Sequence, residues 1–190
     1  MLDDRTLQAI AHAYHQAEKE RRRVRPPSAQ YPGFTIEDGY EVQRRGIALK
    51  LAEGRSVRGR KIGLTSRAMQ SMSGITEPDY GVLLDDMFFA DGADLPFGRF
   101  IEPRLECELA FIMGRRLAGP NCTIFEVLNA ADYVVPAVEI VDLRTLNVDP
   151  ETKAQRKVQD NVQAYLAQLL QKSPVAVNEI GLRKIFEAHQ

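Results

Sequence analysis

The sequence is poor in the residues that mark disulfide-stabilised, zinc-binding or membrane-spanning proteins. Its 190 residues include no tryptophan, two cysteines and three histidines. Two cysteines cannot build a disulfide scaffold, and since Cys107 and Cys122 both lie in apolar stretches, we expect buried, reduced thiols. No His/Cys cluster suits zinc, and no histidine has a serine or cysteine partner at a telling position, which argues against a hydrolase triad. No apolar run approaches the ~18 residues that cross a bilayer.

The chain also lacks an excess of either charge. Its net charge of -1 gives no reason to expect binding to nucleic acid or to an anionic membrane. The N-terminal "MLDDRTLQAI" has no apolar segment of the signal-peptide type, so we expect a cytoplasmic protein. A composition with 44% hydrophobic and 27% charged residues is typical of a globular domain with a real core.

What is present predicts an α+β fold. Helices are expected over residues 3–23 and 35–54, because apolar residues recur at helical spacing and capping residues precede them. Further helices are expected just after Thr65 or Ser66, through Met72, and over 123–132. Capping boxes are expected at the starts of two helices, from Thr35 with Asp38 and from Thr123 with Glu126. A strand and then a turn are expected over 57–66, and strand-like runs broken by Asp and Gly over 79–96. Further strands are expected over 104–113 and 133–144, and Pro136 places the last of these at an edge or a bulge. An amphipathic helical tail is expected over 161–190.

Two glutamates interrupt one of these strands. In "RLECELAF" the period of two places Glu106 and Glu108 on one face. The other face carries apolar side chains, which we expect to point into a core: Leu105, Cys107, Leu109 and Phe111. Glu139 lies in a second apolar strand, "PAVEIVD". Three carboxylates in such surroundings suit a hard divalent cation such as Mg²⁺, which prefers oxygen ligands. The alternative is that the two neighbouring glutamates form the solvated face of a sheet.

Other polar residues have weaker signals. Lys61 enters an apolar strand in "GRKIGL", where it could bind an anionic substrate or transfer a proton, or could simply lie on an edge strand. Asp79 and Tyr80 in "EPDYG" are either site residues or part of a turn, and the local sequence favours the turn. The run "ERRRVR" is interpreted as a solvated face, with anion binding as the alternative.

At these positions the chain resembles the fumarylacetoacetate hydrolase family, and within it the hydratases and decarboxylases of aromatic meta-cleavage pathways. The resemblance rests on stretches including "YPGFTIEDGYEVQ", "GRKIGLTS", "TEPDYGVLLDDMFF", "RFIEPRLECELAF", "GPNCTIFEV" and "DYVVPAVEIVD". It implies a mixed, rolled β-sheet, binding of Mg²⁺ or Mn²⁺ by Glu106, Glu108 and Glu139, and an active-site role for Lys61. It further implies a small 2-oxo acid as substrate, and we expect a homo-oligomer.

The resemblance implies a metal-dependent hydratase that adds water to a 2-hydroxy-2,4-dienoate dicarboxylate. Asp79 is the candidate for guiding the water, and Arg67 or Arg144 for binding the distal carboxylate. The match covers about residues 1–160, with a helical part over 1–55 and a strand-rich part over 56–160. The tail over 161–190 departs from the family, in which further strands complete the sheet. The alternatives are therefore a 4-oxalocrotonate-type decarboxylase, a shortened, inactive chain that serves as an assembly subunit, and a remnant that binds metal without turnover.

Overall fold

A computed structural model describes residues 1–146 of the chain, and they form a mixture of helices and short antiparallel sheets. The described residues divide into two compact units. The first unit contains residues 1–102 and the segment that begins at Asp142, and the second contains residues 103–141. The predicted α+β class is therefore confirmed at this level. The predicted boundary near residue 160 and the helical tail over 161–190 lie outside the described residues.

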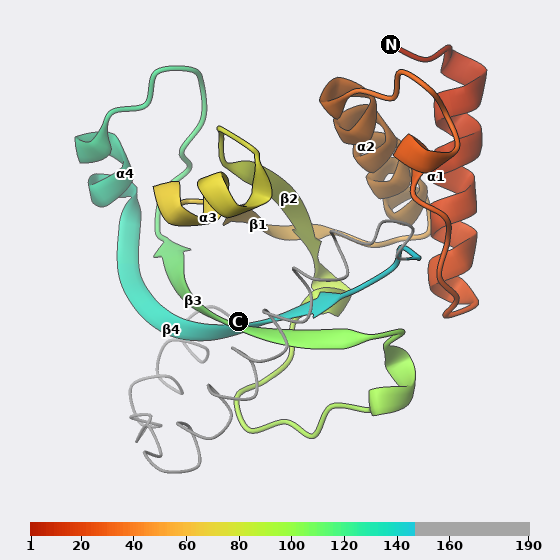
Figure 1. The fold of residues 1–190 in the computed structure, drawn as a ribbon. Helices are drawn as coiled ribbons and strands as arrows, with labels where there is room; N and C mark the ends of the chain where they lie inside the picture. The colour runs from red at the N-terminus through yellow and green to blue at the C-terminus, as the bar shows by residue number, and fades with distance from the viewer. Residues whose placement is uncertain (147–190) are drawn as a thin grey trace. The chain divides into compact units, whose positions relative to one another are not determined.

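Two long helices open the first unit (Figure 1): α1 (Asp4–Lys19) and α2 (Ile36–Ala52). Asp3 caps α1 by accepting a hydrogen bond from the Thr6 backbone N–H. The buried face of α1 supplies most of the buried apolar side chains in the described residues: Leu7, Ile10, Ala11 and Ala17. Between the two helices lies a single 3₁₀ turn, η1 (Pro27–Ala29). The predicted helix pair is thus present, with α1 ending earlier than expected.

A buried acid fixes the start of α2. Thr35 and Asp38 form the expected capping box, and the Asp38 side chain is fully buried. Burial favours the neutral acid, but the backbone N–H groups of Thr35 and Leu2 donate to the carboxylate and hold the pKa of Asp38 below its usual value. Since Leu2 precedes α1, this one side chain ties the beginnings of both helices together.

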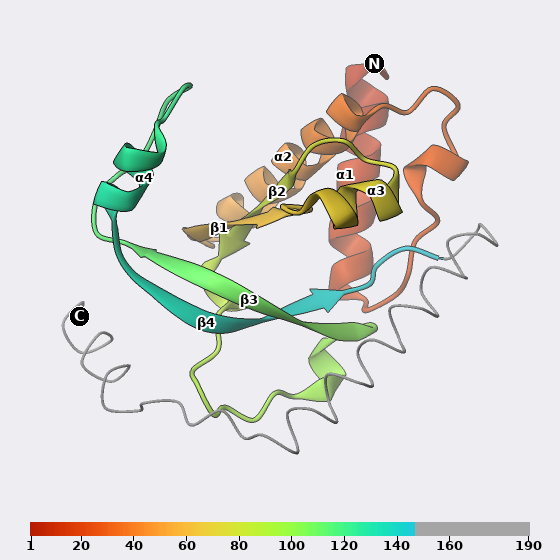
Figure 2. The same cartoon turned by 60° about the vertical axis from the view of Figure 1, so that its left-hand side comes forward.

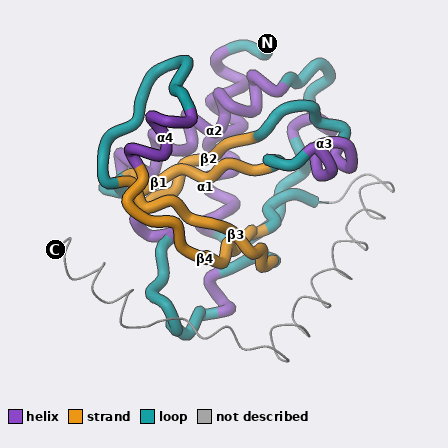
Figure 3. The backbone as a smooth tube through the Cα atoms, turned by 90° about the vertical axis from the view of Figure 1, so that its left-hand side faces the viewer, coloured by secondary structure: helices purple, strands orange, loops and turns teal. Residues whose placement is uncertain are grey.

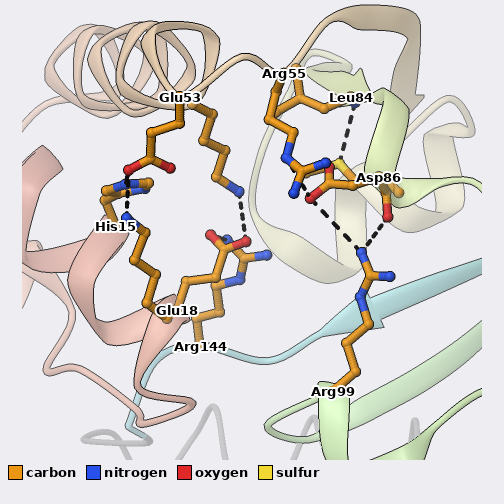
Figure 4. A network of polar contacts seen from close by, with 11 residues as sticks. His15, Glu18, Glu53, Arg55, Leu84, Asp86, Arg99 and Arg144 are labelled. Carbon is orange, nitrogen blue, oxygen red and sulfur yellow. Dashed lines mark hydrogen bonds and ion pairs between the residues drawn. The ribbon is translucent and has the colours of Figure 1, made fainter.

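Ion pairs join the two helices to each other and to the segment that begins at Asp142 (Figure 4). The Glu53 carboxylate accepts from both Lys19 and His15, and these bonds lower the pKa of Glu53 to about 2. The Glu18 carboxylate accepts hydrogen bonds from Lys50 and from Arg144, each with a donor–acceptor distance of 2.6 Å. These contacts occupy cations and acids on three separate segments, so we interpret the network as structural.

The first unit also contains a two-stranded antiparallel sheet, visible as paired strands in Figure 3, made of β1 (Val57–Gly63) and β2 (Asp79–Leu84). The short helix α3 (Arg67–Ser73) connects them and is capped by Ser66, as predicted. Tyr80 of β2 stacks on Tyr40 of α2 with ring centroids 4.4 Å apart. "EPDYG" was predicted to be a turn, and this is wrong for its last three residues, which pair with β1.

The second unit is a ribbon of two long strands, β3 (Pro103–Met113) and β4 (Ala131–Asp142), which Figure 2 shows lying side by side. The Gly114 N–H donates to the Ala130 carbonyl at one end, and the Leu143 N–H donates to the Glu102 carbonyl at the other. This pairing of early with late residues makes the ribbon antiparallel. The helix α4 (Ile124–Ala130) precedes β4 and has the predicted capping box of Thr123 and Glu126.

Pro136 lies inside β4 and is exposed. Among the described residues β4 pairs with β3 alone, so its other side can accommodate a residue without an N–H donor. Two further 3₁₀ turns, η2 (Asp85–Met87) and η3 (Phe97–Arg99), lie between β2 and β3. No helix among the described residues is long and apolar enough to cross a membrane.

Candidate metal centre

The two faces of β3 differ in burial. Arg104 and Glu106 are half-buried, and Glu108 on the same face is exposed. The alternate residues of the strand are largely exposed instead, at 51% for Leu105, 66% for Leu109 and 50% for Phe111. The charged and the apolar side chains of β3 thus lie on opposite faces, as the sequence predicts, but the charged face is the less solvent-exposed one.

Glu139 completes the acidic group from the neighbouring strand. It is half-buried on β4, and one carboxylate oxygen from each of Glu106, Glu108 and Glu139 lies within 4.8 Å of the other two. The antiparallel pairing brings the middle of β3 against the second half of β4, and this explains why residues 31 or more positions apart meet. The predicted convergence of three carboxylates from two strands is present in the structure.

This spacing suits one hard cation. Two oxygens bound to the same Mg²⁺ at about 2.1 Å are at most about 4.2 Å apart. Small rotations of three glutamate side chains therefore suffice to bring their oxygens into a common coordination sphere. Three like charges at this spacing repel one another without a cation, and a solvated face gives no reason for the third carboxylate to join from another strand.

The prediction that the apolar residues of β3 point into a core is wrong. Leu105, Cys107, Leu109 and Phe111 are all exposed, and so is Val138 on β4. The reason is that a two-stranded ribbon has no second layer of its own, and no described element of the second unit covers this face. Only Ala130 is buried among the described residues of this unit.

The prediction of buried thiols fails for the same reason. Cys107 and Cys122 are both exposed, and they are free, as predicted. Cys107 shares the uncovered face of β3 with its apolar neighbours. Cys122 lies in the loop before α4, where its thiol faces the carbonyl oxygens of Ala118 and Gly119. An apolar sequence context indicates burial only when another layer packs against it.

Lys61 and Asp79 lie on one face of the β1–β2 sheet in the first unit. Lys61 pairs with Gly81, and Asp79 pairs with Gly63. The two charged residues are therefore diagonal neighbours across the strands, a relation that places side chains roughly 7–8 Å apart. Both glycines provide room, because a Cβ at Gly81 would lie 3.1 Å from the Lys61 Cγ and one at Gly63 would overlap the Asp79 carboxylate.

The remaining predicted cations lie in the first unit as well. Arg144 follows β4 and is ion-paired to Glu18 over 2.6 Å, which gives it a structural partner. Arg67 is the first residue of α3 and is exposed. In the "ERRRVR" run, Arg22 pairs with Glu20 and Arg23 with Glu102. The interpretation of this run as a charged surface is compatible with these ion pairs.

Sequence reasoning overlooked one cation beside the acidic group. Arg104 lies two residues before Glu106 on the same face of β3 and is half-buried. The signal was available in the period of two, since positions 104, 106 and 108 share one face.

Comparisons with known proteins identify relatives of this chain. None of the protein-family models matches the chain. The chain is 53% identical over 188 residues to the 2-oxo-hept-4-ene-1,7-dioate hydratase of Escherichia coli, covering 97% of this chain and 70% of that protein. It is 40% identical to the 2-keto-4-pentenoate hydratase of Paraburkholderia xenovorans, covering 70% of this chain and 50% of that protein.

A solved structure shows the same relationship. The 4-oxalocrotonate decarboxylase from Pseudomonas putida G7, complexed with magnesium and adipate, superposes with a TM-score of 0.74 at 32% identity. The matched region covers 78% of this chain and 57% of that one. The fold and the relatives thus define a member of the hydratase and decarboxylase group of 2-oxo acid enzymes. The chain belongs to the fumarylacetoacetate hydrolase family.

Proposed function

We propose that this protein is a metal-dependent hydratase that adds water to a 2-hydroxy-2,4-dienoate dicarboxylate. The observation that carries the proposal is the group of three carboxylates from β3 and β4, whose oxygens lie within 4.8 Å of one another. The identity of 53% with a protein named as a 2-oxo-hept-4-ene-1,7-dioate hydratase supports the reaction and the substrate class. As in the family, the ribbon would belong to a larger rolled sheet.

Glu106, Glu108 and Glu139 would hold one divalent cation, Mg²⁺ or Mn²⁺, and leave further coordination positions for the substrate. The related decarboxylase structure contains magnesium. Bound there, the cation would supply Lewis acidity at the 2-oxo group and stabilise negative charge on its oxygen. The chain's own contribution is to keep three carboxylates together on a paired, hydrogen-bonded ribbon.

The reaction consists of a tautomerisation followed by the addition of one water. Loss of the 2-hydroxyl proton and protonation at C5 convert the 2-hydroxy-2,4-diene to the 2-oxo-3-ene. The oxygen of water then adds at C4 while that water loses one proton, and C3 gains one proton, which gives a 4-hydroxy-2-oxo acid. We assign Lys61 to binding the anionic end of the substrate or relaying a proton, and Asp79 to guiding the water.

Two expectations from the sequence belong to the same proposal. One is a cytoplasmic location, consistent with relatives that are metabolic enzymes. The other is a homo-oligomer, and the exposed apolar face of β3 and β4 supports it, since unsatisfied apolar surface of this kind favours association.

An assay with purified protein tests the function. Incubation with 2-hydroxyhepta-2,4-diene-1,7-dioate and Mg²⁺ should remove the diene absorbance and yield the hydrated 4-hydroxy-2-oxo product. Glu106→Gln should abolish turnover, because it removes one anionic ligand without changing the size of the side chain. Asp132→Asn is the matched control, since Asp132 is the second residue of β4 in the same unit but lies outside the acidic group. Full Mg²⁺-dependent activity in Glu106→Gln would contradict the ligand set.

Decarboxylation is the second candidate, favoured by the structural similarity to 4-oxalocrotonate decarboxylase. Both activities act on substrates with a 2-oxo acid end. Hydration forms a C–O bond, whereas decarboxylation breaks the C–C bond to a carboxylate. Release of CO₂ from an oxalocrotonate substrate, with no hydration of the dienoate, would favour the decarboxylase. A folded protein that acts on neither substrate would favour the third alternative, an inactive assembly subunit.

A further inference from the structure

β3 brings a cation next to the three carboxylates. Arg104 and Glu106 are separated by one strand repeat on the same face, and both are half-buried. With a rise of about 3.4 Å per residue, their Cα atoms lie roughly 7 Å apart along the strand. A guanidinium on an arginine stem can therefore remain close to anything bound at the acidic group.

The second unit offers no comparable cation among its described residues. Its other positively charged side chains are Arg115 and Arg116, which follow the far end of β3. Seven or more residues separate them from Glu108, which corresponds to roughly 23 Å of strand. Arg104 is thus the cation of this unit that the strand itself positions beside the acidic group.

The proposed substrate has an anionic group at a matching distance. When its 2-oxo acid end is bound at the carboxylates, the chain from C2 to C7 of a 1,7-dioate extends roughly 6 Å in an extended conformation, from C–C bonds of about 1.5 Å. Resting on the proposed function, we propose that Arg104 binds the distal, C7 carboxylate and sets the preference for dicarboxylates over monocarboxylates. The planar guanidinium suits this role because it can donate two parallel hydrogen bonds to one carboxylate.

The names of the relatives show that this choice exists within the group. The E. coli relative is named for a 1,7-dioate, whereas the P. xenovorans relative is named for 2-keto-4-pentenoate, which has no second carboxylate. The decarboxylase structure contains adipate, a dicarboxylate. A residue that recognises the second carboxylate would separate these substrate classes.

Binding of two stable ligands tests the assignment without turnover. 2-Oxoheptanedioate and 2-oxoheptanoate share the 2-oxo acid end and differ only in the C7 carboxylate. Calorimetric titration in the presence of Mg²⁺ should show that the wild-type protein prefers the diacid. Arg104→Ala should weaken diacid binding about 10- to 100-fold, as expected for lost hydrogen bonds between charged groups. Binding of the monoacid should change less than about twofold, which is within the scatter of a neutral surface substitution.

Two further variants sharpen the test. Arg104→Lys keeps the charge but loses the planar fork, so diacid affinity should fall to an intermediate value and the fold should be preserved. Arg116→Ala removes an equal charge at the far end of β3 and should leave both affinities unchanged. Circular dichroism of each variant verifies that it is folded.

The outcomes are distinguishable. An unchanged ratio of diacid to monoacid affinity in Arg104→Ala, with the wild-type protein binding both, would overturn the Arg104 assignment and leave the proposed function standing. Equal weakening of both ligands, together with weaker Mg²⁺ binding, would also overturn it, because Arg104 would then act on the glutamates. Failure of the wild-type protein to bind either ligand with Mg²⁺ would overturn the proposed function itself.

Discussion

Replacing Glu139 with Gln should make the metal-free protein more stable and its Mg²⁺ response weaker. One carboxylate oxygen of Glu139 lies within 4.8 Å of those of Glu106 and Glu108. Two unit charges at that distance repel by about 0.9 kcal/mol in a water-like dielectric and by about 3.5 kcal/mol at an effective dielectric of 20. None of the three glutamates is buried, and Glu108 is exposed, so the lower figure is used for both pairs, and their repulsion together amounts to about 2 kcal/mol.

Thermal unfolding measured with and without Mg²⁺ separates the two effects. For a chain of this size 1 kcal/mol corresponds to about 2–4 °C, so metal-free Glu139→Gln should unfold about 4–8 °C above the wild-type protein. Mg²⁺ at a hundred times its dissociation constant should stabilise the wild-type protein by about 2.7 kcal/mol. The variant should lose most of that stabilisation. Adding Mg²⁺ should therefore reduce the difference between the two melting temperatures or reverse its sign.

The matched control is again Asp132→Asn, which removes one negative charge from the same strand. Asp132 lies seven residues before Glu139, roughly 23 Å along β4, so its replacement should change neither the metal-free melting temperature nor the Mg²⁺ response. The reasoning is refuted if metal-free Glu139→Gln is less stable than the wild-type protein. An undiminished Mg²⁺ shift in the variant would refute it as well.

Three more outcomes are expected. The pKa of Glu53 is lowered to about 2 by the lysine and histidine of α1; its ion pairs therefore stabilise the fold above pH ~4.5 and are lost as the pH falls towards 2, so melting temperatures between pH 5 and pH 2 should decline less steeply in Glu53→Gln. A Cβ at Gly63 would overlap the Asp79 carboxylate, so Gly63→Ala should cost about 1–3 kcal/mol in a denaturant titration; a neutral result would show that this carboxylate moves freely. Both Cys107 and Cys122 are exposed, so a thiol reagent should modify both in the native protein, whereas labelling only after denaturation would place them in an interface.

Local signals in the sequence predicted the helices of both units well. Capping residues mark the starts of α1, α2, α3 and α4, and in each case the structure has the expected side-chain bond. Such bonds depend on residues three apart, so a short window of sequence contains all the information they need. The strand β2 was predicted only as part of broken strand-like runs over 79–96, and its first three residues were also assigned to a turn. Its partner β1 is separated from it in the sequence by α3, and no local pattern records that pairing.

The acidic group could be predicted only in part from the residues themselves. The period of two placed Glu106 and Glu108 on one face, but whether Glu139 would join them depended on the register between β3 and β4. Resemblance to a family supplied that expectation, and the geometry agrees with it. The burial of the opposite face could not be predicted, since it depends on what packs against the ribbon and not on the ribbon's own sequence.

The acids and the apolar face of β3 follow from the same property of a strand. A strand presents one set of side chains to each side, so charges can gather on one face only if the other face carries the apolar residues. In β3 the charged face is the more enclosed one, which is the reverse of the order that burial of apolar surface favours. A cation between the three carboxylates would offset the repulsion on that face. Packing of another surface against Leu105, Leu109 and Phe111 would stabilise the opposite, apolar face of the strand. The ribbon should therefore become most stable only when both faces are satisfied, and metal binding and association through the apolar face should stabilise the protein additively if the two faces act independently.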